Sequence, residues 1–186
     1  MDFGIRGNAG AFVIGEIGYL RDQGQTTAGN PGNFKIGGYY DPNAYQNLSK
    51  PTQAEIRGNY GIYLLLDQMA YREGGPESKQ GLTPFAVVTV APSDRNTFPF
   101  FCSIGLVYQG LIPRRDCDTT AVRLAYGKFS RALKGQDFEM ILESTYEVAL
   151  APWLTLQPDM QYIFKPGGTG DIPNAFVLGI QISLNL

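Results

Sequence analysis

The sequence of 186 residues contains no histidine. This absence excludes Ser-His-Asp triads, most zinc sites and the usual proton shuttle at neutral pH. Most conventional hydrolase mechanisms depend on one of these groups, so we expect that the protein is not an enzyme. We also expect that it holds no metal ion.

The sequence also lacks long apolar runs and an excess of charge of either sign. Its 15 lysines and arginines are mixed with 17 aspartates and glutamates, for a net charge of −2. Without a basic stripe we expect no binding to nucleic acid. No apolar run approaches the roughly 18 to 20 residues that a membrane-spanning helix needs. Any crossing of a membrane must therefore be made by strands.

The N-terminus has neither the charged start nor the apolar core of a secretory signal. It reads Met1-Asp2-Phe3-Gly4, and an exported barrel could not begin in this way. The sequence is then either a mature or internal portion of a longer chain or a cytosolic protein that does not enter a membrane. We favour the first interpretation.

Apolar and polar residues alternate most clearly in the last quarter of the chain, Phe138 to Leu186. Over residues 138–150 one set is mainly apolar, and the other contains Glu139, Glu143 and Glu147. A strand and a helix both explain this segment, because the glutamates also follow the i, i+4 spacing of one helix face.

The two following runs decide in favour of strands. Residues 154–164 alternate in the same way and include Pro158, which the interior of a helix does not accept. Residues 176–186 repeat the alternation over 11 residues, and strands that span a bilayer need about 9 to 11 residues. We therefore predict three adjacent strands.

The polar face of these strands has two explanations. In a soluble sandwich the apolar face is the core and the polar face meets solvent. In a wide membrane barrel the polar face lines water and the apolar face meets lipid, whereas a small barrel has too little lumen for several carboxylates and amides. Alternation by itself does not distinguish the two.

Six further alternating segments precede this region, separated by stretches rich in turn residues. We predict strands over residues 10–20, 34–41, 58–72, 82–91, 98–108 and 122–127. Both faces of residues 58–72 are partly apolar, so the sequence does not fix their facing, and we predict a long loop over residues 42–57. The total is about nine strands in one all-β domain, residues 1–186. A closed bacterial barrel has an even number of strands, so nine indicates an incomplete barrel.

Seven short motifs follow one another along the chain. They are Gly37-Gly38-Tyr39-Tyr40-Asp41, Gly61-Ile62-Tyr63-Leu64 with Asp67-Gln68, Ala91-Pro92-Ser93-Asp94-Arg95-Asn96, Gly110-Leu111-Ile112-Pro113 with Arg115-Asp116, Ala151-Pro152-Trp153-Leu154, Leu156-Gln157-Pro158-Asp159-Met160-Gln161-Tyr162 and Pro166-Gly167-Gly168-Thr169-Gly170. In this order they resemble the carbohydrate-selective porins of Gram-negative outer membranes. The resemblance extends from about residue 10 to residue 186, yet it covers only the C-terminal half of a family member.

The resemblance implies a 16-stranded antiparallel up-and-down transmembrane β-barrel, of which this chain supplies part. It implies a multi-pass protein of the outer membrane through which glucose and related sugars diffuse passively, with no cofactor and no energy coupling. The expected partners are small sugars, outer-membrane lipid and the missing N-terminal half of the barrel. A non-catalytic structural or adhesive β-domain at the cell surface is the alternative function.

Two departures from the family pattern affect these expectations. The signal peptide and the first half of the barrel are absent, so the chain alone is not expected to close or to conduct. Outer-membrane barrels usually end in an aromatic residue that the assembly machinery recognises, whereas this sequence ends in Leu186. That difference makes efficient assembly doubtful.

Polar residues on the predicted strands are the candidate site. A lumen that selects sugars must offer charged and amide groups to hydroxyls, together with aromatic faces to C–H groups. We therefore predict a pore lining that contains Arg123, Glu139, Glu143, Glu147, Gln157, Asp159 and Gln161. Each of them could also simply wet the channel wall without binding anything.

Two catalytic or ligand-binding interpretations of polar motifs fail on spacing. Residues four apart on a strand are separated by about 13 Å, so Glu139, Glu143 and Glu147 are too distant for paired catalysis or a shared calcium ion. The segment Lys165 to Gly170 resembles a phosphate loop only superficially, because it lacks the required spacing and no helix follows. We predict an ordinary loop there.

Three structural expectations follow. Nine apolar residues should share one outward face: Phe138, Leu142, Tyr146, Leu154, Leu156, Met160, Phe176, Leu178 and Ile182. The sheet should be an open, curved half-barrel with unpaired first and last strands. Cys102 and Cys117 should not form a disulfide, because strand and loop residues place them roughly 20 Å apart against a Cα limit of about 7 Å.

Overall fold

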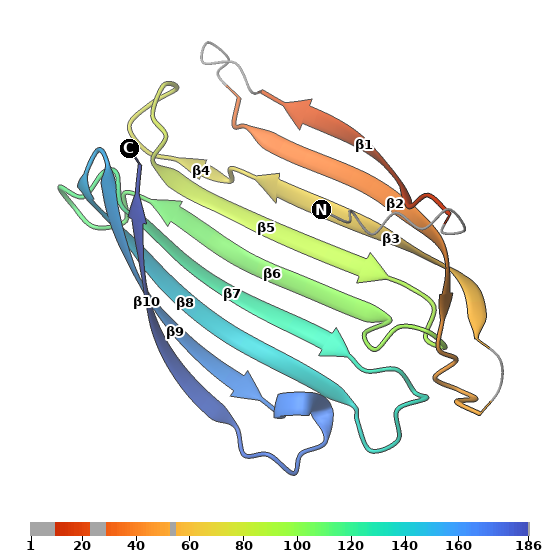
Figure 1. Ribbon diagram of the computed structural model, residues 1–186. Helices are drawn as coiled ribbons and strands as arrows, with labels where there is room; N and C mark the ends of the chain where they lie inside the picture. Colours follow the sequence, from red (N-terminus) through yellow and green to blue (C-terminus); the bar gives the residue numbers. More distant parts are fainter. Residues whose placement is uncertain (1–9, 23–28, 53–54, 186) are drawn as a thin grey trace, which may run out of the picture.

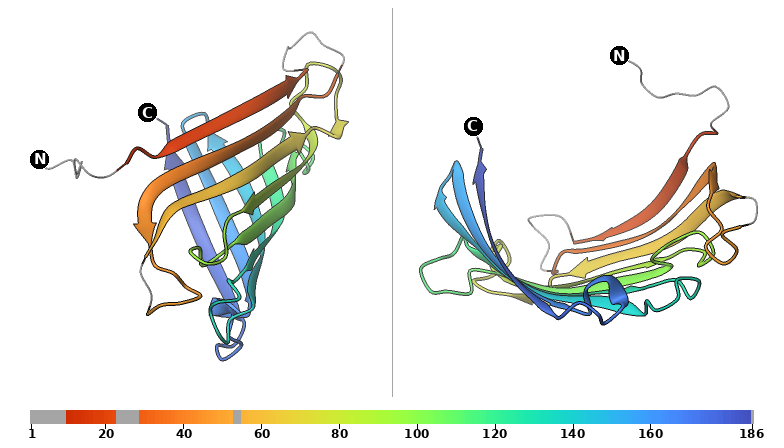
Figure 2. Two further views of the ribbon diagram at one scale, coloured as in Figure 1. Left: turned by 90° about the vertical axis from the view of Figure 1, so that its right-hand side faces the viewer. Right: turned by 60° about the horizontal axis from the view of Figure 1, so that its bottom comes forward.

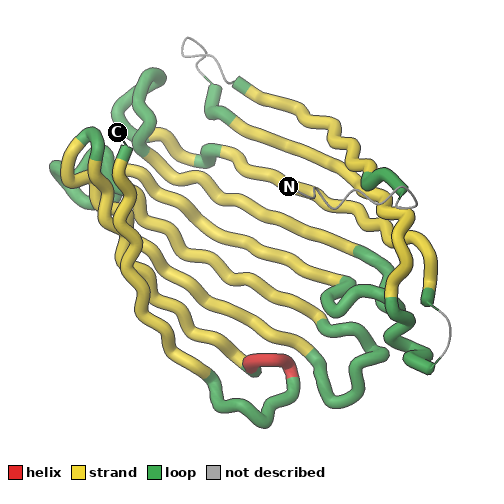
Figure 3. Tube along the Cα trace, in the orientation of Figure 1, coloured by secondary structure: helices red, strands yellow, loops and turns green. Residues whose placement is uncertain are grey.

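The computed structural model describes residues 10–22, 29–52 and 55–185, which form one antiparallel sheet (Figure 1). Within these residues one short 3-10 turn, η1 (Pro166–Gly168), is the only helical element (Figure 3). Ten strands follow the chain: β1 (Val13–Arg21), β2 (Gly32–Tyr45), β3 (Ile56–Gln68), β4 (Tyr71–Arg72), β5 (Gly81–Val90), β6 (Phe100–Gln109), β7 (Thr119–Lys128), β8 (Phe138–Ala151), β9 (Leu154–Phe164) and β10 (Ala175–Leu184).

The strands pair in chain order, as in an up-and-down meander. The two-residue strand β4 pairs with β5, as β3 does, and its register is displaced by one residue from that of β3. We therefore regard β4 as the continuation of β3 after an interruption at residues 69–70. With this joining, the nine predicted strands correspond to the nine long strands of the sheet, and the strand prediction for residues 138–150 is confirmed over the helical alternative.

Several predicted boundaries were wrong. Strand β2 continues to Tyr45, so the loop predicted over residues 42–57 is shorter; a register shift between Asp41 and Ala44 accommodates Pro42. Strand β1 begins at Val13 and not at residue 10, and β6 begins at Phe100 and not at residue 98. Strand β10 ends at Leu184, and Leu186 lies outside the described residues.

Alternate residues of every long strand face opposite sides of a curved sheet, which Figure 2 shows as a trough. Curvature spreads the side chains of the convex face, where Ile104 is 54% exposed and Leu142 43% exposed. It crowds those of the concave face, where Ser103 is 4% exposed and Ala125 is 7% exposed. The same assignment shows which way the side chains of β3 face, with Ile62, Leu64 and Leu66 on the convex side.

The convex face is apolar across the whole sheet. Cross-strand registers place all nine residues predicted to face outward on this one side, with Leu142 opposite Leu124 and Tyr162, and Leu178 opposite Met160. Exposure there is high, as for Leu178 at 71% and Ile17 at 77%. These side chains are not a buried core, so a soluble sandwich does not describe the fold.

The sheet is open, as predicted. Within the described residues β1 pairs only with β2 and β10 pairs only with β9. The right-hand view of Figure 2 places these two strands at opposite edges of the trough. Each edge therefore presents backbone N–H and C=O groups that could pair with further strands.

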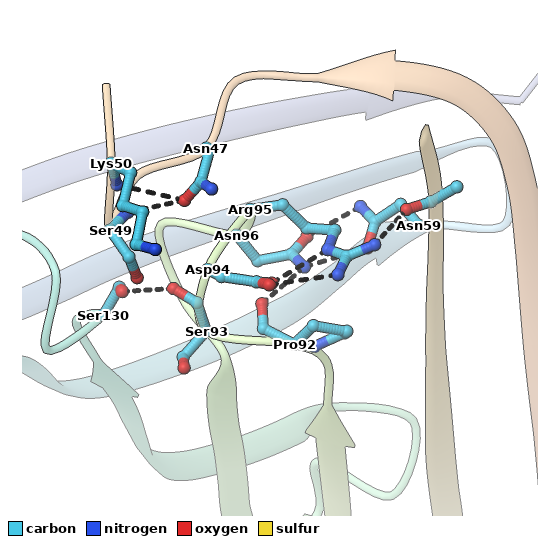
Figure 4. A network of polar contacts seen from close by, with 11 residues as sticks. Asn47, Ser49, Lys50, Asn59, Pro92, Ser93, Asp94, Arg95, Asn96 and Ser130 are labelled. Carbon is cyan, nitrogen blue, oxygen red and sulfur yellow. Dashed lines mark hydrogen bonds and ion pairs between the residues drawn. The ribbon is translucent and has the colours of Figure 1, made fainter. Parts of the chain in front are cut away.

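Side chains of the turn between β5 and β6 bind it to the start of β3 (Figure 4). Asn96 and Asn59 exchange two hydrogen bonds of 2.9 Å, and Asn59 is 6% exposed. Arg95 forms an ion pair of 2.8 Å with Asp94 and donates to the carbonyl oxygen of Gly58. The hydrogen bond from Arg95 holds the pKa of Asp94 below its usual value. This turn is therefore held from one side by β3.

The turn between β7 and β8 holds the β5–β6 turn from the other side. The hydroxyl of Ser130, which is fully buried, donates to the carbonyl oxygen of Ser93. The amide of Ser130 donates to the carbonyl oxygen of Thr97 at 2.9 Å. The amide of Leu48 adds a 2.7 Å bond to the carbonyl oxygen of Asp94. Loops far apart in the sequence thus form one connected rim.

Cys102 and Cys117 are both free thiols, as predicted. Cys102 lies in β6 opposite Val88, and Cys117 lies beyond the other end of that strand, beside β7. Titration of thiols on the unfolded, unreduced monomer should therefore count two. A count of zero on unaggregated monomer would contradict the arrangement of this hairpin.

Candidate functional site on the concave face

The predicted polar residues lie together on the concave face of β7, β8 and β9. Arg123, Glu143 and Gln161 are direct cross-strand neighbours in one row. Arg123 and Glu143 form an ion pair of 2.5 Å, with the Glu143 side chain 14% exposed and Arg123 46% exposed. Because cross-strand pairs of opposite charge stabilise a sheet, this pair fixes the orientation of both side chains.

Asp159 and Gln157 continue the polar surface on β9. The side-chain amide of Gln161 donates to Asp159 at 2.9 Å. Asp159 lies opposite Thr145 on β8 and Gly179 on β10, and Gln157 lies opposite Gln181. Carboxylate and amide oxygens therefore alternate along this wall with amide donors, a combination that suits hydroxyl groups.

The three glutamates of β8 occupy separate rows. Glu139 lies opposite Gly127 and accepts a 2.7 Å hydrogen bond from the amide of Gly167 in η1. Glu147 lies opposite Thr119, four residues from the ion-paired Glu143. The extended conformation of β8 thus keeps the glutamates apart, in agreement with the predicted spacing. Among the described residues, no group of three or more His, Cys, Asp or Glu side chains could hold a metal ion.

A second polar group on the concave face was missed by the sequence prediction. Lys35 forms an ion pair of 3.1 Å with Glu16, and the hydroxyl of Tyr63 donates to Glu16 at 3.0 Å. Tyr63 reaches across β2 because Gly37 has no side chain; a Cβ there would lie 2.3 Å from the tyrosine ring. The alternation of residues 34–41 was the available signal, since it places Lys35 on the other face of the strand from the apolar residues.

No helix in the described part of the chain is long and apolar enough to cross a membrane.

Comparison with known proteins identifies close counterparts of this sheet. The profile of the family described as carbohydrate-selective porin, OprB family, matches residues 1–186. Porin B of Pseudomonas aeruginosa is 27% identical over 185 aligned residues, which cover 82% of this chain and 40% of Porin B. The chain therefore spans less than half the length of this curated relative.

Two solved structures of Pseudomonas putida OprB have the same fold. The high-pH structure aligns with a TM-score of 0.87 and 24% identity, over 98% of this chain and 50% of that one. The low-pH structure aligns with a TM-score of 0.63 and 22% identity, over 93% and 46% of the two chains. The open sheet thus corresponds to about half of such a structure.

Proposed function

Because the chain belongs to the carbohydrate-selective porin family, OprB family, we propose that it forms one wall of a channel for passive diffusion of sugars of the glucose type. Members of this family are β-barrel proteins of the Gram-negative outer membrane, and they are channels, not enzymes. The proposal concerns what passes through this wall and by which mechanism.

The observation that carries the proposal is the separation of the two faces over the whole sheet. The convex face is apolar from β1 to β10, with Ile17 and Ile180 among its most exposed residues. The concave face carries the ion pairs Lys35–Glu16 and Arg123–Glu143. Lipid on the convex side and water on the concave side satisfy both surfaces, as in a wide barrel.

The pore lining that we propose comprises the seven predicted residues and the Glu16 group. Sugars are uncharged and rich in hydroxyls, so their passage requires acceptors and donors that replace bound water. Carboxylates of Glu143 and Asp159, the guanidinium of Arg123 and the amide of Gln161 supply both kinds. No energy source or cofactor enters this mechanism, because diffusion follows the concentration gradient.

The open edges β1 and β10 are where further strands complete the barrel in this proposal. Liposomes that contain the chain alone should show absent or erratic conductance and no steady swelling in glucose. Liposomes that contain a full-length member with this chain as its C-terminal half should swell in isotonic glucose, and more slowly in a larger oligosaccharide.

Two outcomes would contradict the proposed function. A full-length barrel that folds in the bilayer but excludes glucose would indicate a structural or adhesive β-domain. A protein that leaves the membrane fraction without detergent would contradict the placement of the convex face in lipid.

A further inference from the structure

A hollow of about 330 Å³ opens on the concave face beside the turn between β5 and β6. Its walls come from four adjacent strands and that turn: Thr89, Phe98, Phe101, Ala125, Gly127, Glu139 and Ile141. Four of these residues form one cross-strand row, in which Thr89, Phe101, Gly127 and Glu139 are successive neighbours. The size falls in the range of small-molecule sites, about 300 to 1,000 Å³.

Aromatic side chains form one side of this hollow. The strand predicted over residues 98–108 would place Phe98 on the same face as Phe100 and Cys102, but Phe98 precedes β6 and its ring covers Gly127 on the concave face. A Cβ on Gly127 would lie 2.8 Å from the Phe98 ring, so glycine is needed for this approach. Phe98 is 41% exposed, which leaves an aromatic surface open to the concave side.

The Phe98 ring is held in place from behind. Its centroid lies 4.4 Å from that of Phe129, which is 6% exposed. The neighbouring Thr97 carbonyl oxygen accepts from the amide of Ser130 at 2.9 Å, and the Pro99 carbonyl oxygen accepts from Ala91 at 2.9 Å. These contacts therefore position an aromatic surface before any ligand arrives.

Polar groups stand at the two ends of the cross-strand row. One carboxylate oxygen of Glu139 accepts from the amide of Gly167 at 2.7 Å, which fixes the side chain. In the described part of the chain no hydrogen bond engages the other oxygen. Thr89 adds a hydroxyl at the far end of the row. The hollow thus offers an aromatic surface on one side and a fixed acceptor on another.

A pyranose ring has the complementary chemistry, with an apolar C–H face and a rim of hydroxyl groups. We infer that this hollow binds one hexopyranose ring, with its C–H face against Phe98 and Phe101 and a hydroxyl donated to Glu139. The inference rests on the proposed function and adds the site at which the sugar binds on its way through the channel. The site needs only β5 to β8, their turns and η1, so it is complete without strands beyond β1 and β10.

Binding can therefore be measured on this chain itself, folded in micelles of lauryldimethylamine oxide, a detergent without a sugar headgroup. Saturation-transfer NMR with methyl α-D-glucopyranoside should show the strongest transfer at ring C–H protons. Open-chain glucitol, which has hydroxyls but no ring face, should show little. Phe101→Leu should weaken binding about fivefold, through loss of the aromatic face.

Glu139→Gln provides the second variant, because its amide oxygen can still accept from Gly167 while the charge is lost. We expect about threefold weaker binding for it. Phe100→Leu, one residue away on the convex face, is the matched control and should bind as the original chain does. Glu77→Gln in the β4–β5 turn is the control for loss of a carboxylate.

The outcomes separate this site from the proposed channel. Equal transfer to glucitol, or unchanged binding in folded Phe101→Leu and Glu139→Gln, would overturn the binding site even if the complete barrel passes glucose. Ring-selective binding that both variants weaken would support the site even if the complete barrel excludes glucose, in which case the proposed channel function would fail alone.

Discussion

Replacement of Leu142 by arginine is expected to destabilise the folded protein in a lipid bilayer by about 2 to 4 kcal/mol, the penalty for a cation on the lipid face near the midplane. Leu142 lies near the middle of β8 on the convex face and is 43% exposed. Its cross-strand neighbours Leu124 and Tyr162 offer no counter-charge. Urea titrations in vesicles, with the folded fraction read from heat-modifiable gel migration, would measure the loss.

Thr145→Arg is the matched control for this experiment. Thr145 lies on the same strand but on the concave face, opposite Asp159 on β9. An arginine there meets water and a carboxylate, so its effect should stay below about 1 kcal/mol. Equal losses for the two variants, or no loss for Leu142→Arg, would contradict lipid contact at the convex face.

The strands of this sheet could be predicted because a strand alternates its side chains with a period of two. Residues 154–164 show the principle, since Pro158 excluded a helix and the apolar set became the convex face. The same reasoning failed at Phe98, which continues the alternation of β6 but belongs to the preceding turn. Its position depends on the hydrogen bond between Ser130 and Thr97, which joins segments that no local pattern connects.

The side of each candidate residue could be predicted, but its partner could not. Alternation places Arg123 and Glu143 on polar faces of their strands. Their ion pair depends on the register of β7 against β8, which the hairpin turn and packing set together. The hollow at Phe101 was missed for the same reason, because its row combines residues from four strands. The sequence around Gly127 does not predict its role, because that role depends on the Phe98 ring that lies over it.

Asp118 holds together the end of the β6–β7 hairpin and β8. This carboxylate is 3% exposed and accepts from Arg115 at 2.6 Å, from the hydroxyl of Tyr146 and from the amide of Ala149 at 3.0 Å. The β7–β8 pairing ends at Glu147, so the carboxylate takes the place of a β7 partner for Ala149, which pairs with Thr155 of β9 on its other side. One side chain therefore accepts from three donors, the guanidinium of Arg115, the hydroxyl of Tyr146 and the backbone amide of Ala149.

Asp118→Asn should lower the free energy of unfolding by about 2 to 3 kcal/mol, because a neutral amide weakens three bonds to a buried acceptor. Chemical unfolding in micelles at pH 7 would measure this loss. Asp116→Asn is the matched control: Asp116 is exposed in the same turn, and Gln109 bonds to its backbone oxygen, which the change keeps. A comparable loss in both variants would contradict a specific role of Asp118.

The pH dependence gives a second test of the same group. Burial alone would raise the pKa of Asp118, but the hydrogen bonds from Tyr146, Arg115 and Ala149 outweigh it and hold the pKa below its usual value. The carboxylate therefore stabilises the fold fully above its unfolded pKa of about 3.9, and this contribution disappears as pH falls through the lower folded pKa. Asp118→Asn should thus differ from the original chain at pH 7 and approach it below about pH 4. A stability difference that stays constant down to pH 3 would show that the charge of Asp118 is not what stabilises this end of the sheet.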